Sequence, residues 1–261
     1  MDSLVERWLT YLLTERSRSP HTIAAYRRVL ATIENPETAT REDIEAWWRT
    51  RTHLSPSTRN QELSAVRQFY GWCRRWEHRD DDPCARIDPP KKPHRVSRFV
   101  GKDDLTRLLA NLPPDLRRAV ALGAYGGLRV SEAASLDWSD INVESRRIIV
   151  RGKGDKERVV GLTTTLLDHL LPDTGGNVVR AGGGPFSGHT LQQKVNAAIR
   201  DQGVDATFHK LRHRFGYKAA EAGIPATSIA RAMGHESLTT TMGYIAAVDS
   251  DLDLIAEAVT R

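Results

Sequence analysis

The sequence contains little cysteine and has no long apolar run. Its 261 residues include two cysteines, Cys73 and Cys84, which are too few for a disulfide-stapled scaffold or a four-cysteine zinc site. Neither has histidine partners at metal-ligand spacing, so we predict that both are packing residues. No apolar stretch approaches the roughly 18 residues that a membrane helix needs. The first residues carry acids and no cleavable apolar segment, so we expect a cytoplasmic protein without a signal peptide or membrane span.

Net positive charge is concentrated in one short segment. The chain has 38 Lys+Arg against 33 Asp+Glu, a formal net charge of +5. Residues 1–90 contain no lysine and balance 14 arginines with 14 acids, and residues 99–261 hold 20 basic and 19 acidic residues. The excess lies in residues 91–98, whose basic members are Lys91, Lys92, Arg95 and Arg98. Proline disfavours helix here, so the segment is either a solvated linker or an extended strap along a polyanion such as DNA.

The first ninety residues have the pattern of four short helices. Ser-Pro pairs at 19–20 and 55–56 are typical N-caps followed by proline in the first turn, and Thr40 with Asp43 resembles a capping box. Apolar residues at helical spacing supply inner faces, while arginines occupy the outer ones. Such a unit is either a DNA-gripping module or an ordinary helical bundle. Its candidate DNA contacts are Arg59 and Arg67.

The rest of the chain mixes helices with one hairpin. Residues 103–145 have a helical pattern with a break at 112–114, and Ser131 is a candidate cap for the helix that follows Gly126-Gly127. Residues 147–162 predict a β-hairpin whose turn contains Lys153. This lysine is either an ordinary solvated turn residue or one held where it can reach a phosphate.

Several polar residues gather late in the sequence. His209, Arg212 and His213 share one face of a predicted helix because they are three and four positions apart. The two histidines have metal-ligand spacing, but Lys210 next to the first one opposes a cation, so we do not expect zinc. His235 and Tyr244 follow downstream.

These residues, together with Arg129, match a family pattern. In order and spacing, the sequence resembles the tyrosine recombinase (phage integrase) family at Arg129 in GGLRVSE, Lys153 in GKGDKER, His209 and Arg212 in HKLRHRF, His235 in MGHES and Tyr244 in TTMGY. The beginning of the chain resembles that family's core-binding domain through Ser19, Thr22 and Tyr26, so the resemblance covers nearly the whole chain. The departures are Phe208, where many members have proline, and Gly216-Tyr217, where they tend to have Ala-Thr.

The resemblance implies a fold and a domain organisation. We expect a mainly α protein with a small β-sheet (α+β), built as a two-domain C-shaped DNA clamp. Residues 1–88 would form a SAM-like core-binding domain, 89–98 a basic linker and 99–261 the catalytic domain. With no extra arm-binding domain expected at the N-terminus, the chain resembles Xer-type recombinases or short integrases of bacterial, archaeal or phage origin.

The resemblance also implies an activity. A site-specific recombinase of this family cleaves and rejoins DNA through a covalent 3′-phosphotyrosine, without metal, cofactor or ATP, and exchanges strands between two DNA sites through a Holliday junction. A type IB topoisomerase-like enzyme, which nicks and reseals only, and a catalytically inactive DNA-binding regulator are the alternatives. The partners would be double-stranded DNA sites, three further protomers in a tetramer, and an accessory factor that the sequence does not identify. Residues 250–260 would dock on a neighbouring protomer or fold back on their own domain.

The family pattern further implies a role for each matched residue. Tyr244 would be the nucleophile, and Arg129 and Arg212 would clamp the phosphate oxygens. His209 would take or return the tyrosyl proton. The remaining roles fall to Lys153 as the acid for the leaving 5′-oxygen, His235 as a phosphate hydrogen-bond donor and Glu132 as the carboxylate that orients Arg129.

Overall fold

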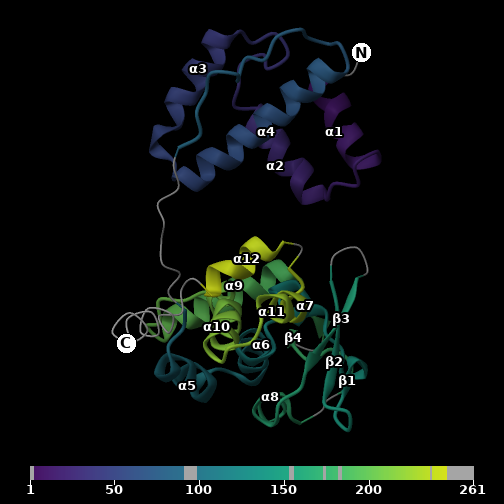
Figure 1. The fold of residues 1–261 in the computed structure, drawn as a ribbon, viewed down its shortest axis with the longest axis vertical. Helices are drawn as coiled ribbons and strands as arrows, with labels where there is room; N and C mark the ends of the chain where they lie inside the picture. The colour runs from purple at the N-terminus through teal and green to yellow at the C-terminus, as the bar shows by residue number, and fades with distance from the viewer. Residues whose placement is uncertain are drawn as a thin grey trace, which may run out of the picture. The chain divides into compact units, whose positions relative to one another are not determined.

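The computed structural model describes residues 3–90, 99–152, 156–172, 175–181, 184–235 and 237–245. The chain divides into two compact units, Met1–Arg95 and Val96–Arg261 (Figure 1). The division falls inside the basic segment that the sequence marks as a linker. Residues 91–98, and with them Lys91, Lys92, Arg95 and Arg98, lie outside the described residues.

The first unit is helical, and its helices begin where the sequence predicts. The Oγ atoms of Ser19 and Ser55 each accept a hydrogen bond from the backbone N–H three residues on. Thr40 and Asp43 form the predicted capping box. The helices are α1 (Leu4–Thr14), α2 (Pro20–Leu30), α3 (Arg41–Thr50) and α4 (Pro56–Arg75), with a 3-10 turn at Arg51–His53.

Large aromatic side chains fill the core of this unit. Trp8 is buried and stacks on Tyr26 with ring centroids 5.4 Å apart, and it meets the edge of Phe69 at 5.6 Å. Cys73 and Cys84 are free thiols inside the same core, and burial raises their pKa to about 11 and about 12. Both cysteines therefore pack as neutral apolar groups, as predicted.

The second unit is built around one buried helix, α6. Its residues from Arg118 to Ala124 are buried, because α5, α8, α9 and α10 all pack against it. Arg118 is accommodated in this core by donating to the carbonyls of Leu170 and Pro172, both at 2.8 Å. The helices are α5 (Lys102–Asn111), α6 (Pro114–Gly126), α7 (Val130–Ser135), α8 (Thr164–Leu170), α9 (Gly188–Asp201), α10 (Phe208–Glu221), α11 (Ala226–Met233) and α12 (Leu238–Ile245).

An antiparallel sheet lies beside these helices and confirms the predicted hairpin (Figure 1). Strand β2 (Arg147–Arg151) pairs with β3 (Glu157–Gly161), with Ile149 opposite Val159. Short β1 (Ile141–Asn142), which the sequence pattern did not predict, adds to β2. A second pair joins β4 (Arg180–Ala181) to β5 (Gly184–Pro185). The turn containing Lys153 lies outside the described residues.

Two local predictions were wrong. The helical pattern of 103–145 ends with α7 at Ser135, because the Asp137 carboxylate accepts the Ser139 N–H and starts a 3-10 turn, Trp138–Asp140, that leads into β1. Ser131 is not a cap but a residue inside α7. The N-cap position is Arg129, whose backbone N–H donates to the Glu132 carboxylate at 2.7 Å.

The mainly α class with a small sheet is confirmed. Within the described parts of the chain, no helix is both long and apolar enough to span a bilayer.

Candidate active site

The junction between α6 and α7 places the first site arginine. Gly127 ends α6 with a φ of +66°, and a Cβ there would lie 2.6 Å from Cδ1 of Phe215. Only glycine meets both requirements, a left-handed backbone and close contact with an aromatic ring. The turn it allows puts Arg129 at the start of α7.

Arg129 is held by Glu132 but still reaches the surface. Its Nη1 donates to the Glu132 Oε1 at 3.0 Å and its Nη2 to the Gly234 carbonyl at 2.5 Å, yet 41% of the side chain is exposed. The Glu132 side chain is 2% exposed. Burial alone would raise its pKa, but hydrogen bonds from Arg158 and Arg129 outweigh burial and hold the pKa of Glu132 below its usual range. The site therefore keeps a buried carboxylate anion.

Arg212 projects from α10 into the interior. Its Nη1 donates to the Gly127 carbonyl and its Nη2 to the Met233 carbonyl, both at 2.6 Å, and Nη1 lies 3.9 Å from Glu132. The side chain is 3% exposed, and burial followed by the nearby Arg129 lowers its pKa to about 10. It remains a cation at neutral pH. Two of its five N–H donors bind these carbonyls.

Two histidines of α10 lie next to each other. The rings of His209 and His213 meet edge to face at 4.3 Å. Burial and the charges of Arg212 and Arg129 lower the pKa of His209. Burial, followed by His209, lowers the pKa of His213 to about 4, and the His213 Nδ1 is buried without a hydrogen-bond partner in the described residues. Both imidazoles are therefore neutral at pH 7, because burial and the neighbouring charges oppose their protonation.

His235 follows the C-terminus of α11. Gly234 ends that helix with a φ of +65°. The His235 Nδ1 lies 2.8 Å from Oγ1 of the buried Thr241 on α12. Burial and the charges of Arg212 and Arg129 lower the pKa of His235 to about 4. The contact with Thr241 leaves the Nε2 edge of the ring for another group.

Tyr244 lies inside the site rather than on its surface. Its ring is 5.4 Å from that of His213 and 6.1 Å from that of His235, centroid to centroid. The residue is 6% exposed, and burial raises the pKa of its phenol despite the opposing effect of Arg212 and Arg129. The ring packs on Gly216, where a Cβ would lie 2.5 Å from the Tyr244 Cε2. Tyr217, by contrast, stacks on Phe99 with ring centroids 3.9 Å apart.

The structure thus brings together most residues that the sequence singled out, and it does so within the second unit. Arg129 and Arg212 both lie against Glu132. The Tyr244 ring neighbours His235 directly and His209 through His213, and Arg129 binds the Gly234 carbonyl next to His235. Lys153 and residues 250–260 lie outside the described residues, so their roles stay predictions.

Sequence reasoning missed a third arginine in this site. Arg158 of β3 donates to both carboxylate oxygens of Glu132 at 2.7 Å. The sequence places Arg158 on a strand of the hairpin, and an arginine there has the pattern of a residue that faces solvent. The local pattern therefore did not indicate a role in the site. His213 was noted only for its spacing and Gly216 only as a departure from the family pattern, yet both contact Tyr244.

The two DNA-contact candidates of the first unit have partners within it. The Arg59 guanidinium lies 4.2 Å from the centre of the Trp48 ring, and Arg67 donates to the Ile87 carbonyl. Their contacts with DNA stay predictions. A groove along α2 and α4 is lined by polar side chains that include His21, Arg28, Asn60 and Gln61.

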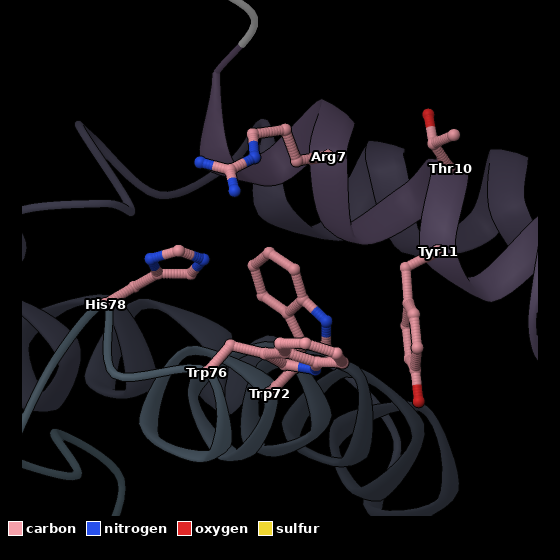
Figure 2. Close-up of a pocket in the computed structure, with 6 residues that line it drawn as sticks. All are labelled: Arg7, Thr10, Tyr11, Trp72, Trp76 and His78. Atoms are coloured by element: carbon pink, nitrogen blue, oxygen red, sulfur yellow. The ribbon is translucent and has the colours of Figure 1, made fainter.

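A separate pocket of the first unit is aromatic. It is lined by Arg7, Thr10 and Tyr11 of α1, by Trp72 of α4, and by Trp76 and His78 just after that helix (Figure 2). It contains none of the residues that carry the chemistry described above.

Among the described residues, no group of three or more His, Cys, Asp or Glu side chains is placed to hold a metal ion. That the chemistry needs no metal stays a prediction.

Comparison with known proteins gives the class. Residues 98–250 match the phage integrase family, and residues 5–77 match the phage integrase N-terminal SAM-like domain. The chain belongs to the phage integrase family. A tyrosine recombinase XerC of Xanthomonas campestris pv. campestris is 30% identical over 93% of this chain and 83% of its own length. The XerC of Actinobacillus succinogenes is 28% identical over 94% and 92%.

Solved structures show the same fold. XerA recombinase matches with a TM-score of 0.55 and 25% identity, over 99% of this chain and 98% of its own. A lambda integrase dimer bound to a COC′ core site matches with a TM-score of 0.78 and 19% identity, over 94% and 95%. The second likeness is one of fold alone.

Proposed function

We propose that this protein is a site-specific tyrosine recombinase whose nucleophile is Tyr244. The observation that carries the proposal is the placement of a buried phenol beside two neutral imidazoles, His213 and His235, with Arg129 and Arg212 joined through one carboxylate. This combination suits attack on a phosphodiester, because the guanidinium groups can neutralise the non-bridging oxygens of a five-coordinate phosphorus. The XerC relatives named above support the assignment.

The reaction is a transesterification. The Tyr244 Oη attacks the phosphorus, and a 3′-phosphotyrosine bond forms as the bond to the 5′-oxygen breaks. The tyrosyl proton passes to His209, and Lys153 gives a proton to the departing 5′-oxygen. A 5′-hydroxyl then attacks the phosphotyrosine and reverses these transfers. One phosphoester replaces another at each step, so the exchange needs no ATP.

The electrostatics of the site explain why a base is needed. Burial raises the pKa of Tyr244, so the phenol keeps its proton at neutral pH and must lose it during attack. His209 is neutral because burial and two arginines lower its pKa, and it can therefore accept that proton. Arg212 and Arg129 stabilise the negative charge that forms.

The substrate in this proposal is double-stranded DNA. Residues 1–88 would be the core-binding domain, 89–98 the linker and 99–261 the catalytic domain. The groove along α2 and α4 supports contact with base edges through its amide, imidazole and guanidinium groups. We place the active form, in the cytoplasm, as a tetramer on two DNA sites that is joined through residues 250–260.

The first test is covalent capture. Wild-type protein is mixed with a pool of randomised duplexes, each with a nick, so that the short released strand cannot religate. We expect an SDS-resistant protein–DNA adduct with the wild type and none with Tyr244→Phe, which should still bind DNA. Tyr217→Phe is the matched control, because Tyr217 also lies in the second unit but stacks on Phe99, and it should keep the adduct. An adduct formed by Tyr244→Phe would show that the nucleophile is another residue.

Two alternatives are tested on the captured sequence. A plasmid with two copies of it should yield recombined products, whereas a type IB topoisomerase-like enzyme would yield only relaxed plasmid. Lack of any adduct with wild-type protein that binds the same DNA would support the inactive regulator.

A further inference from the structure

Glu132 is surrounded by three guanidinium groups, and only two of them have a place in the reaction described above. Arg129 and Arg212 lie 3.0 Å and 3.9 Å from its oxygens, while Arg158 makes the closest contacts, at 2.7 Å to each oxygen. A paired, two-point contact is the strongest geometry that a guanidinium and a carboxylate adopt. Arg158 is therefore the main anchor of the carboxylate that orients Arg129.

Besides the two carboxylate oxygens of Glu132, Arg158 binds a backbone carbonyl on a different element. Its Nε donates to the Ala232 carbonyl at 2.8 Å. Ala232 lies in the last turn of α11, next to Met233 and Gly234, whose carbonyls accept from Arg212 and Arg129 respectively. One side chain from β3 thus links α7 to the end of α11, which leads directly into His235.

The packing around this guanidinium leaves it little freedom. The Arg158 side chain is 10% exposed. Gly234 approaches so closely that a Cβ there would lie 3.2 Å from both Cδ and Nη1 of Arg158 and 3.3 Å from Nη1 of Arg129. With its Nε and both Nη atoms already donating to protein acceptors, Arg158 is poorly placed to bind a phosphate itself.

We propose that Arg158 is a positioning residue for DNA cleavage, which sets the place of Arg129 through Glu132 and the place of His235 through Ala232. The proposal rests on the proposed recombinase function of the same site. Without Arg158, the Glu132 carboxylate is held only by the backbone N–H and the guanidinium of Arg129 and turns toward the remaining arginines. The end of α11 is then no longer tied to β3. A misplacement on the scale of an ångström is enough to slow the chemistry by about 100-fold.

The same unit offers a matched control. Arg118 is also a buried arginine, and it also donates to backbone carbonyls, those of Leu170 and Pro172, but it touches none of the residues assigned to the reaction. Removal of either arginine leaves buried carbonyls unpaired and should lower stability. Only removal of Arg158 should change the chemistry.

The experiment compares Arg158→Gln, Arg158→Lys and Arg118→Gln with wild type below the melting temperature of all four. We expect Arg158→Gln to bind the nicked duplex as wild type does but to form adduct about 100-fold more slowly. Arg158→Lys should recover part of that rate, because an ammonium can still bond Glu132. Arg118→Gln should cleave at the wild-type rate despite a lowered melting temperature. Equal cleavage by Arg158→Gln and wild type would overturn the proposal.

A second measurement uses the free protein and does not depend on activity. The groups that lower the pKa of His235, after burial itself, are Arg212, Arg129, Arg158 and His209. Titration of the His235 ring followed by NMR should show a higher pKa in Arg158→Gln than in wild type, and no change in Arg118→Gln. An unchanged His235 titration in Arg158→Gln would show that Arg158 does not lie beside His235 as the proposal requires, whereas lack of adduct with wild type would count against the proposed function instead.

Discussion

At the scale of single residues, the proposed nucleophile Tyr244 packs where Gly216 has no side chain. Gly216 lies in the middle of α10, where glycine normally weakens a helix. Here it lets the Tyr244 ring approach to a distance at which any Cβ would overlap it. The departure of Gly216 from the family pattern therefore has a physical reason in this chain: it makes room for the buried tyrosine.

Gly216→Ala should consequently destabilise the second unit. The gain in helix propensity is about 1 kcal/mol, whereas overpacking against an aromatic ring costs about 1–3 kcal/mol, so we expect a net decrease in the free energy of unfolding. Gly71→Ala in α4 is the control, since a Cβ there has no atom within 4 Å, and it should stabilise the protein. Denaturant unfolding measures both. A Gly216→Ala protein as stable as Gly71→Ala would show that the ring is not confined as described.

At the scale of elements, one helix organises the chemistry. α10 carries His209, Arg212, His213 and Gly216, and it packs on both α6 and α12. Its N-terminus is set by Thr207, whose side chain accepts the Lys210 N–H. A shift of this helix would move three groups together: His209, the proposed base; Arg212, a proposed phosphate ligand; and Gly216, on which the Tyr244 ring packs.

The buried histidines make the stability of this unit depend on pH. The pKa values of His213 and His235 lie near 4 in the folded protein, below the ordinary value of 6.5. Protonation therefore favours the unfolded chain, so the stability that these neutral rings allow is present above pH 6.5 and is lost as the pH falls toward 4. We expect the free energy of unfolding to fall across that window.

The test compares His213→Gln with His189→Gln. His189 is an exposed histidine of α9 in the same unit. Removal of His213 should flatten the decline of stability between pH 6.5 and 4, whereas removal of His189 should leave it unchanged. Identical pH profiles for His213→Gln and wild type would contradict the assignment of a depressed pKa to His213.

At the scale of the whole molecule, the position of the charged residues indicates the proposed DNA partner better than the net charge does. The formal charge of +5 comes mainly from residues 91–98, between two nearly neutral parts of the chain. In the second unit, Arg158 and Arg212 are in the interior and are bound to Glu132 or to carbonyls. We therefore expect the general attraction for DNA to come from other basic residues.

Replacement of the four basic residues of 91–98 by glutamine tests whether this segment supplies the general attraction for DNA. They are Lys91, Lys92, Arg95 and Arg98. If the segment lies along phosphates, the quadruple glutamine variant should bind all DNA sequences more weakly, and the slope of log affinity against log salt concentration should be flatter by up to ~0.9 for each phosphate that is no longer neutralised. The adduct chemistry should be unchanged at saturating protein. An unchanged salt slope would mean that the segment is a linker only.

The helix starts and the hairpin were predictable from the sequence and are confirmed. The sequence also predicted the ordered set of site residues, whose roles in the reaction stay a proposal. Caps such as Ser19 and Thr40 act on their own neighbours, so local pattern suffices to find them, and the residues from Arg129 to Tyr244 occupy family spacings that need no coordinates. Only the tertiary structure shows the contacts of Arg158 and Gly216. A strand arginine has the pattern of a surface residue until Glu132 and Ala232 are brought to it from distant segments. A helical glycine has no evident use until Tyr244 packs against it, because contacts between remote segments leave no local periodicity to detect.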